Sequence, residues 1–296
     1  MNIQFLKPGS RIGIVAPAGP VKENQLYSPL QLLKSMGIQP VLAPHLFDQK
    51  GFVSSSVENR IQDLHAFYSD PTIDAIWAAR GGYGTIQLLE DLNYDQIQKS
   101  SKPLIGFSDI TALQWAIYAR SGLPAFSGFA LTLQFTETNP FFSQGWAVLQ
   151  GKEQVYEAVP DVMVLQQGQA EGVLLSGTLA LISALVGTPF FPEDDPIILC
   201  IEDIEEPLYR IDRMLFQLRL SGVLARVQGV ILGRFLWKNR FLNIDQLIRP
   251  HFPENIPIVC QFPYGHVADA LLMPTGVWAQ FTTSPFTIRW SFKSLV

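Results

Sequence analysis

Cysteine and histidine are both scarce in this chain. Of its 296 residues, 2 are Cys and 4 are His. Cys200 and Cys260 each lie inside an apolar, strand-like run, which predicts buried free thiols rather than a disulfide framework. The histidines are far apart and lack the H-x-x-x-H or C-x-x-C spacing of a metal site, so we expect neither a protein-built metal centre nor a metal cofactor.

Charge is limited as well, and positive charge most of all. Charged residues make up 16% of the chain, the formal net charge is -5, and Lys and Arg are scattered rather than clustered. Nucleic acid and anionic membranes are therefore not expected as main partners. Hydrophobic residues make up 48%, which favours a large buried core.

Targeting and membrane-spanning segments are not evident from the sequence. Residues 1–9 lack the basic and apolar regions of a signal peptide. Residues 172–191 are uncharged over roughly the length of a membrane span, but glycines and Pro189 interrupt them and acidic residues flank them. We interpret residues 178–186 as a buried helix and expect a cytoplasmic protein.

The first half of the chain alternates strand-like and helical segments. Apolar runs predict strands at 11–16, 39–43, 74–79 and 103–107, and helical spacing predicts helices at 23–36, 56–68 and 85–92. This order predicts a parallel sheet with helices on both faces. The helix at 56–68 is expected to be amphipathic, with Ile61, Leu64 and Phe67 on its apolar side and Glu58, Arg60 and Asp63 on its polar side.

The composition changes between residues 151 and 172, where a helical pattern gives way to a polar segment. We place a domain boundary there, between residues 1–155 and 156–296. The second half is predicted to contain helices at 178–186 and 208–221 and strands at 197–201, 227–232 and 256–262. Aromatic and Thr residues alternate at 278–292, which indicates further strand.

Ser108 occupies the point where the predicted strand at 103–107 gives way to a helical pattern. A hydroxyl on such a turn stands at the sheet edge, close to the free N–H groups of the next helix. Gly106 and Ser108 fit the G-x-S-x-G nucleophile elbow, although Ile110 stands where its second glycine would be. The alternative is that Ser108 or Asp109 only caps the helix.

Three further segments carry residues suited to catalysis. The glycines of Arg80-Gly81-Gly82-Tyr83-Gly84 could present backbone N–H groups to an oxyanion, or could form only a tight turn. Glu202 and Asp203 end a buried strand, and one of them could orient a histidine. His266 follows a predicted strand and a glycine, whereas His45 and His65 are weaker candidates.

Together these segments resemble the successive motifs of the LD-carboxypeptidases, the serine peptidase family that includes the microcin C self-immunity peptidase. The motifs are, in chain order, Ile14-Val15-Ala16-Pro17-Ala18-Gly19-Pro20, Ala79-Arg80-Gly81-Gly82-Tyr83-Gly84, Ile105-Gly106-Phe107-Ser108-Asp109-Ile110-Thr111, Glu202-Asp203 with Tyr209-Arg210-Ile211-Asp212-Arg213, and Tyr264-Gly265-His266. The resemblance extends nearly from end to end. Two stretches depart from the usual pattern, Ser176-Gly177-Thr178 and Leu271-Leu272-Met273-Pro274-Thr275-Gly276. We expect neither to touch the catalytic residues, so that the departures bear only on the fine substrate preference.

The resemblance implies a fold and a set of roles. The fold is a flavodoxin-like N-terminal domain followed by an α+β domain with a swivelling β-barrel-like core. Ser108 is the implied nucleophile, Glu202 the acid and His266 the base, with the backbone N–H groups of Gly82 and Asp109 as the oxyanion hole. Arg80 and Tyr83 are candidates for substrate binding, and Arg210, Arg213 and Arg234 are alternatives for reading a terminal carboxylate.

Three functions are consistent with these residues. The first is a cofactor-free serine carboxypeptidase that releases a terminal D-amino acid, such as D-Ala of a murein tetrapeptide, during peptidoglycan recycling; we expect it to be a homodimer. The second is a detoxifying peptidase or amidase acting on peptidyl-adenylates, which would need an aromatic side chain (Trp77, Trp115, Trp237 or Trp278) against the base. The third is a non-enzymatic ligand-binding protein in which Ser108 is only a cap.

Overall fold

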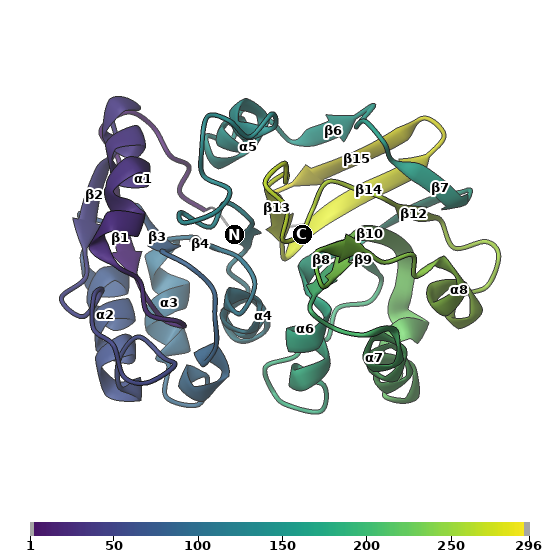
Figure 1. Ribbon diagram of the computed structural model, residues 1–296, viewed down its shortest axis with the longest axis horizontal. Helices are drawn as coiled ribbons and strands as arrows, with labels where there is room; N and C mark the ends of the chain where they lie inside the picture. Colours follow the sequence, from purple (N-terminus) through teal and green to yellow (C-terminus); the bar gives the residue numbers. More distant parts are fainter. Residues whose placement is uncertain (1–2, 293–296) are drawn as a thin grey trace.

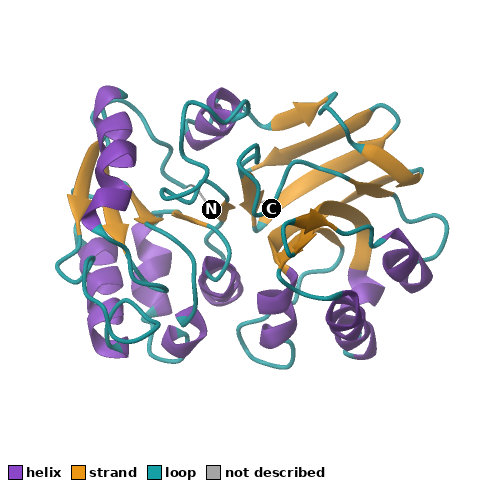
Figure 2. Ribbon diagram, viewed as in Figure 1, coloured by secondary structure: helices purple, strands orange, loops and turns teal. Residues whose placement is uncertain are grey.

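The computed structural model describes residues 3–292, which form two sheets with helices packed around them (Figures 1 and 2). Figure 1 shows most of the first sheet at the left, in purple and blue, with its last strand in yellow near the centre, and the second sheet at the right, in teal, green and yellow. The mixed α/β fold with a parallel sheet, expected from the alternating pattern, is confirmed.

The first sheet has the strand order β2-β1-β3-β4-β5-β13, and its first five strands are parallel. Strands β1, β3, β4 and β5 are almost entirely apolar and buried, whereas the edge strand β2 is partly exposed. The sixth strand comes from the far end of the chain and pairs antiparallel with β5. The strands are β1 (Arg11–Val15), β2 (Gln39–Leu42), β3 (Ala75–Ala78), β4 (Leu104–Gly106), β5 (Ala125–Ser127) and β13 (Met273–Thr275).

The helices of the first half match the predicted positions with two exceptions, one helix that is absent and one that was not predicted. They are α1 (Glu23–Ser35), α2 (Val57–Ser69), α3 (Tyr94–Ser100), α4 (Ile110–Ser121) and α5 (Phe142–Leu149). The helix predicted at 85–92 is wrong, because only Thr85–Leu88 is helical, as a single 3₁₀ turn. The Asn93 side chain accepts the Gln96 N–H at 3.0 Å and so begins a separate helix, α3, that the sequence pattern did not reveal.

Helix α2 corrects a second expectation, since the predicted polar side of this helix is largely buried. Arg60 donates to the carbonyls of Pro17 at 2.9 Å and Gly84 at 3.0 Å, and Asp63 lies 2.9 Å from the ring of His45. These partners, distant in the sequence, satisfy the two charged groups and allow them to be buried.

The second sheet has the order β6-β15-β14-β8-β9-β10-β12-β7, with β11 paired to β10. Strands β8, β9, β10 and β12 are mutually parallel, and the strands on either side are antiparallel. The strands are β6 (Val155–Glu157), β7 (Met163–Gln166), β8 (Gln169–Thr178), β9 (Ile197–Ile204), β10 (Val227–Trp237), β11 (Arg240–Phe241), β12 (Ile258–Cys260), β14 (Val277–Thr283) and β15 (Phe286–Ser291).

Helices α6 (Leu179–Leu185) and α7 (Leu208–Leu220) connect the parallel strands β8, β9 and β10, and α8 (Asp245–Ile248) lies between β10 and β12. The remaining 3₁₀ turns are Val223–Arg226 and Arg249–His251. The uncharged stretch 172–191 is therefore a strand followed by the expected short helix, which is only partly buried, through Leu179, Ile182 and Leu185. None of the helices within residues 3–292 has the length and apolar character needed to cross a membrane.

Hydrogen bonds to the first half of the chain hold the loop that carries His266 in place. The hydroxyls of Ser127 and Tyr264 lie 2.6 Å apart, joining the end of β5 to this loop. The buried Gln134 amide donates to the Gly265 carbonyl at 2.6 Å. The loop is thus attached to the first half of the chain although it follows a strand of the second sheet.

Candidate active site

Ser108 lies on the turn between β4 and α4, as predicted from the sequence. Its φ of 67° is in the left-handed region, which a non-glycine residue occupies only when the surrounding structure holds it there. Gly106 permits the turn, since a Cβ at this position would lie 2.7 Å from Ile110 Cγ2. The backbone therefore presents the Ser108 side chain at the carboxyl edge of the sheet, where ligands of parallel sheets bind.

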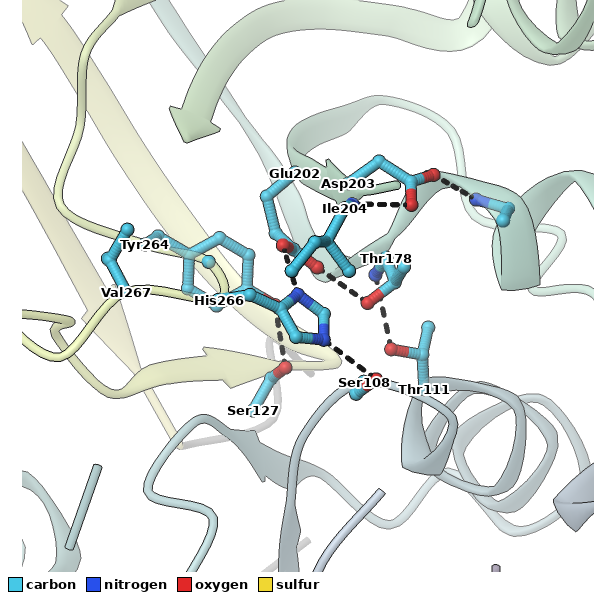
Figure 3. A network of polar contacts seen from close by, with 12 residues as sticks. Ser108, Thr111, Ser127, Thr178, Glu202, Asp203, Ile204, Tyr264, His266 and Val267 are labelled. Carbon is cyan, nitrogen blue, oxygen red and sulfur yellow. Dashed lines mark hydrogen bonds and ion pairs between the residues drawn. The ribbon is translucent and has the colours of Figure 1, made fainter. Parts of the chain in front are cut away.

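The structure brings Ser108, His266 and Glu202 into a hydrogen-bonded row (Figure 3). Ser108 Oγ lies 2.9 Å from His266 Nε2, and His266 Nδ1 lies 2.8 Å from Glu202 Oε2. An ionised carboxylate only accepts hydrogen bonds, so Nδ1 carries the proton and Nε2 is free to accept the serine hydroxyl. This arrangement can increase the nucleophilicity of Ser108.

Burial differs along this row. The Glu202 side chain is fully buried, whereas His266 is 15% exposed and Ser108 is half-buried. Burial alone lowers the pKa of His266, but the charge and hydrogen bond of Glu202, aided by the charge of Asp203, outweigh it and raise the pKa overall. The Phe107 ring packs against the imidazole with 4.7 Å between ring centroids and helps to fix its orientation.

Neither Ser108 nor Asp109 caps helix α4 with its side chain, which was the alternative to a catalytic role. Asp109 is the N-cap residue of α4, yet its side chain makes no capping hydrogen bond. Its buried carboxylate instead accepts the backbone N–H of Thr85 at 2.9 Å. Burial raises the pKa of Asp109, while the hydrogen bonds from Thr85 and Gly84 and the charge of Arg60 oppose this effect.

The glycine-rich loop that follows β3 lies directly against Ser108. A Cβ on Gly81 would be 2.7 Å from Ser108 Cβ, so only glycine fits there. Gly82 has a φ of 131° and is exposed. Neither the Gly82 nor the Asp109 backbone N–H has a protein acceptor among the residues that the structure describes.

The candidate substrate-binding residues lie in the same loop. Arg80 is half-buried and donates from Nη1 to the Pro20 carbonyl at 3.2 Å. Tyr83 is 52% exposed, and its ring meets that of Phe52 edge to face at 5.4 Å. The pair forms an exposed aromatic surface adjoining the glycine loop.

The other candidate arginines have partners of their own. Arg210 pairs with Glu206 on the surface at 3.4 Å, and Arg213 lies over the Tyr209 ring. Arg234 hydrogen-bonds Gln261 and lies over Phe241.

The remaining candidate histidines and acid lie elsewhere. His45 contacts Asp63, and His65 accepts the Asn93 N–H at 2.9 Å. Asp203 faces away from His266 and accepts the backbone N–H of Ala180 at 2.8 Å. Burial, together with the neighbouring Glu202, raises the pKa of Asp203 to about 7.

Cys200 and Cys260 are free and buried, as predicted. No cluster of three or more His, Cys, Asp or Glu side chains that could hold a metal ion is found within residues 3–292.

Four residues that support the site were not identified from the sequence as doing so. They are Arg60, Thr85, Gln134 and Thr178. Each acts through a hydrogen bond to a residue or loop that is distant in the sequence, so no local pattern marks it. A buried charge on a helix, as at Arg60, is a signal visible only once the fold is known.

Comparisons with known proteins cover both halves of the chain. Residues 12–128 match the model of the LD-carboxypeptidase N-terminal domain, and residues 171–281 match that of the LD-carboxypeptidase C-terminal domain. A putative carboxypeptidase of Streptomyces coelicolor is 36% identical, with 96% of this chain and 94% of the relative covered. The murein tetrapeptide carboxypeptidase of Pseudomonas aeruginosa is 31% identical, with 90% and 91% covered.

A solved structure shows the same fold. The crystal structure of an MccF-like protein from Bacillus anthracis superimposes with a TM-score of 0.89 at 25% identity, covering 97% of this chain and 98% of that one. The family models match both halves of the chain, and the relatives are similar along nearly their whole length. The chain therefore belongs to the LD-carboxypeptidase family of serine peptidases.

Proposed function

We propose that this protein is a serine carboxypeptidase that hydrolyses an L,D-peptide bond and releases a terminal D-amino acid. The observation that carries the proposal is the row Ser108–His266–Glu202, with 2.9 and 2.8 Å between successive heavy atoms. Ser108 is the nucleophile, His266 the general base and Glu202 the acid that orients the imidazole.

Each step of the reaction uses these three side chains. His266 Nε2 takes the hydroxyl proton as Ser108 Oγ attacks the carbonyl carbon of the scissile amide. The imidazolium that forms is stabilised by the Glu202 carboxylate and then gives its proton to the departing amine. Water, activated by the same histidine, hydrolyses the resulting acyl-enzyme and regenerates Ser108.

The oxyanion that develops during attack needs donors directed at it. We assign this role to the backbone N–H groups of Gly82 and Asp109, which flank Ser108 and lack protein acceptors in the described chain. Asp109 adds the start of helix α4, where the helix dipole favours negative charge.

We propose D-Ala of a murein tetrapeptide as the leaving residue, and peptidoglycan recycling as the process. Support comes from the relative of Pseudomonas aeruginosa named murein tetrapeptide carboxypeptidase. An exopeptidase must also bind the free terminal carboxylate, because burying this charge without a partner is costly. Arg80 is the cation of the glycine loop itself, and we propose it, together with Tyr83, for substrate binding.

A detoxifying peptidase acting on peptidyl-adenylates is the alternative, suggested by the MccF-like fold. Such a substrate calls for an aromatic ring against its base. Trp77 and Trp115 are fully buried and donate to the carbonyls of Phe129 and Ser176, so neither can stack on a nucleobase. This leaves Trp237 and Trp278, which are half-buried, among the tryptophans considered.

Finer features of the fold and setting are also proposals. The order β2-β1-β3-β4-β5 is that of flavodoxin-like sheets, to which we assign the N-terminal half. We further propose a domain division at residues 155/156, which lies within strand β6 of the second sheet, a swivelling β-barrel-like core in the second half, and a cytoplasmic homodimer. Light scattering tests the homodimer, and cell fractionation tests the cytoplasmic location.

The function is tested by mass spectrometry of murein tripeptide, tetrapeptide and pentapeptide after incubation with the protein. We expect only the tetrapeptide to lose D-Ala, with no change in the Ser108→Ala variant. Hydrolysis of an aminoacyl-sulfamoyl adenosine but of none of the murein peptides would instead support the detoxifying enzyme. Absence of Ser108 labelling by a biotinylated fluorophosphonate, along with no hydrolysis, would support a non-enzymatic protein.

A further inference from the structure

Both oxygens of the buried Glu202 carboxylate have a donor, but the proposed reaction uses only one of them. Oε2 accepts from His266 Nδ1 at 2.8 Å, and Oε1 accepts from the Thr178 hydroxyl at 2.6 Å (Figure 3). Thr178 ends strand β8 and stands opposite Glu202 in the parallel β8–β9 pair. Its side chain is buried, so water does not replace it as a donor without rearrangement.

Thr178 also contacts the helix that follows the nucleophile. Its backbone N–H donates to Thr111 Oγ1 at 3.1 Å, and the Thr111 N–H donates to the Ser108 carbonyl at 2.9 Å. The hydrogen bonds therefore form a closed ring of five residues: Ser108, Thr111, Thr178, Glu202 and His266. The ring begins and ends at Ser108, once through its backbone and once through its hydroxyl.

The close approach of β8 to α4 depends on the residues that precede Thr178. At Gly177 a Cβ would lie 2.3 Å from Thr111 Cγ2, so a larger residue would push the strand away from the helix. The Trp115 indole N–H donates to the Ser176 carbonyl at 2.9 Å and holds the same strand one helical turn further along. The packing of Gly177 against Thr111 and the hydrogen bond from Trp115 to Ser176 thus both hold Thr178 next to α4.

We propose that Thr178 is a positioning residue: its hydroxyl fixes the Glu202 carboxylate toward His266, and its backbone ties that carboxylate to the nucleophile helix through Thr111. This inference rests on the proposed function, since it assigns Thr178 an effect on the Ser108–His266–Glu202 row. Thr178 thereby connects Glu202, in the second half of the chain, to the helix that follows Ser108, in the first half.

The physical reason is that a carboxylate can rotate about its final side-chain bond. With one oxygen hydrogen-bonded to Thr178, only one orientation directs the other oxygen at His266. Without the hydroxyl, Oε1 is a buried acceptor that has lost its donor, and the carboxylate gains by turning toward any other donor or toward water. His266 then loses the partner that sets its tautomer and stabilises its positive charge.

The test measures how fast a biotinylated fluorophosphonate labels Ser108, alongside kcat and KM on the murein tetrapeptide. Labelling forms the Oγ–P bond, expels fluoride and passes the hydroxyl proton to His266, so it reports nucleophile activation whatever the natural substrate. The variants are Thr178→Val, which removes the hydroxyl at nearly constant shape, and Thr178→Ser, which restores it. Ser108→Ala is the control for the proposed function.

A matched control for stability is available on strand β13, which hydrogen-bonds the same strand β8. Thr275 Oγ1 accepts the Ser176 N–H at 3.1 Å and is equally buried, but it does not contact Glu202. We expect Thr275→Val to lower the melting temperature about as much as Thr178→Val while labelling at the wild-type rate. Should Thr178→Val fail to fold, Thr111→Val tests the same ring from the helix side, and it should also slow labelling.

We expect Thr178→Val to reduce kcat and the labelling rate roughly 10- to 100-fold, the effect of losing a hydrogen bond to a charged group, with little change in KM. Thr178→Ser should recover most of the rate. In the Glu202→Gln background, Thr178→Val should have almost no further effect, because the two act through one carboxylate.

The inference is overturned if Thr178→Val labels within twofold of wild type, if Thr178→Ser is as slow as Thr178→Val, or if the effects of Thr178→Val and Glu202→Gln simply add. Tetrapeptide hydrolysis or labelling that survives Ser108→Ala would instead contradict the proposed function.

Discussion

The Asp109 carboxylate accepts the backbone N–H of Thr85 at 2.9 Å, and the Thr85 hydroxyl donates to the Asp109 carbonyl at 2.6 Å. This double bridge joins the residue after the proposed nucleophile to the end of the glycine loop. Arg60 completes the connection by donating to the Gly84 carbonyl at 3.0 Å. The two N–H groups that we assign to the oxyanion hole are thereby held on loops that are fixed to each other.

Replacing this carboxylate should loosen the oxyanion hole without removing a donor. In Asp109→Asn an amide NH₂ takes the place of one acceptor oxygen, and the charge that faces Arg60 is lost. We expect kcat to fall roughly 10- to 100-fold, less than the loss of an oxyanion donor can cause, with KM nearly unchanged. Steady-state kinetics measure this, with the exposed Asp95→Asn as control; a normal kcat would show that the bridge is not needed.

The three side chains of the row should contribute unequally to catalysis. We expect Ser108→Ala and His266→Ala to lower kcat by roughly 10⁴ or more, and Glu202→Gln by somewhat less, because the base can still act when its orienting partner is weakened. Circular dichroism should show that each variant is folded. Near-full turnover by a folded Ser108→Ala protein would contradict the assignment.

The sequence predicted the positions of these residues better than their contacts. Ser108 and the glycine loop follow neighbouring strands of one parallel sheet, whose carboxyl ends lie along a common edge, so their proximity follows from the βαβ order. Glu202 lies on β9 of the second sheet and His266 on the loop after β12 of that sheet, and no local rule relates that sheet to the first. Only the family resemblance selected Glu202 over Asp203, and the structure shows why they differ: one faces His266 and the other faces the start of α6.

Most of the features that were missed depend on long-range partners. Strand β13 pairs with β5 across about half of the chain, and the three residues of β13 carry no strong strand pattern. The sequence pattern places Arg60 on a solvated helix face, whereas in the structure the carbonyls of Pro17 and Gly84 accept its hydrogen bonds and it is buried. The wrong helix at 85–92 is only partly of this kind. Thr85 binds the distant Asp109, but Asn93 starts the new helix through a local cap on Gln96.

The pH dependence of activity should reflect the raised pKa of His266. Because the base must be neutral, kcat/KM should fall as the pH drops through a pKa above the ordinary histidine value of 6.5. In Glu202→Gln the carboxylate that favours the charged imidazole is gone, so the acidic limb should move to lower pH. Rate profiles of both proteins measure this, and a limb that does not move would show that Glu202 does not set the pKa of His266.

Asp203 should make the folded protein less stable as the pH rises. Burial and Glu202 raise its pKa to about 7, from an ordinary value of 3.8, so the folded state retains a proton that the unfolded chain has lost between these values. Unfolding free energy should therefore decline as the pH increases from about 4 to 7. Asp203→Asn stays neutral, so its melting temperature relative to wild type should increase across this interval; parallel melting curves would exclude the effect.

Recognition of the substrate terminus gives a final prediction. An exopeptidase that reads a free carboxylate with an Arg gains a charge-assisted pair, which a C-terminal amide cannot form. Amidating the terminal D-Ala should therefore raise KM or abolish turnover. Arg80→Lys or Arg80→Gln should raise KM for the free acid if Arg80 is the reader, while Arg210→Gln, on a surface pair with Glu206, serves as control. Equal kcat/KM for the free acid and the amide would contradict the exopeptidase and favour a general amidase. If Arg80→Gln still strongly prefers the free acid, another cation such as Arg234 must bind the carboxylate.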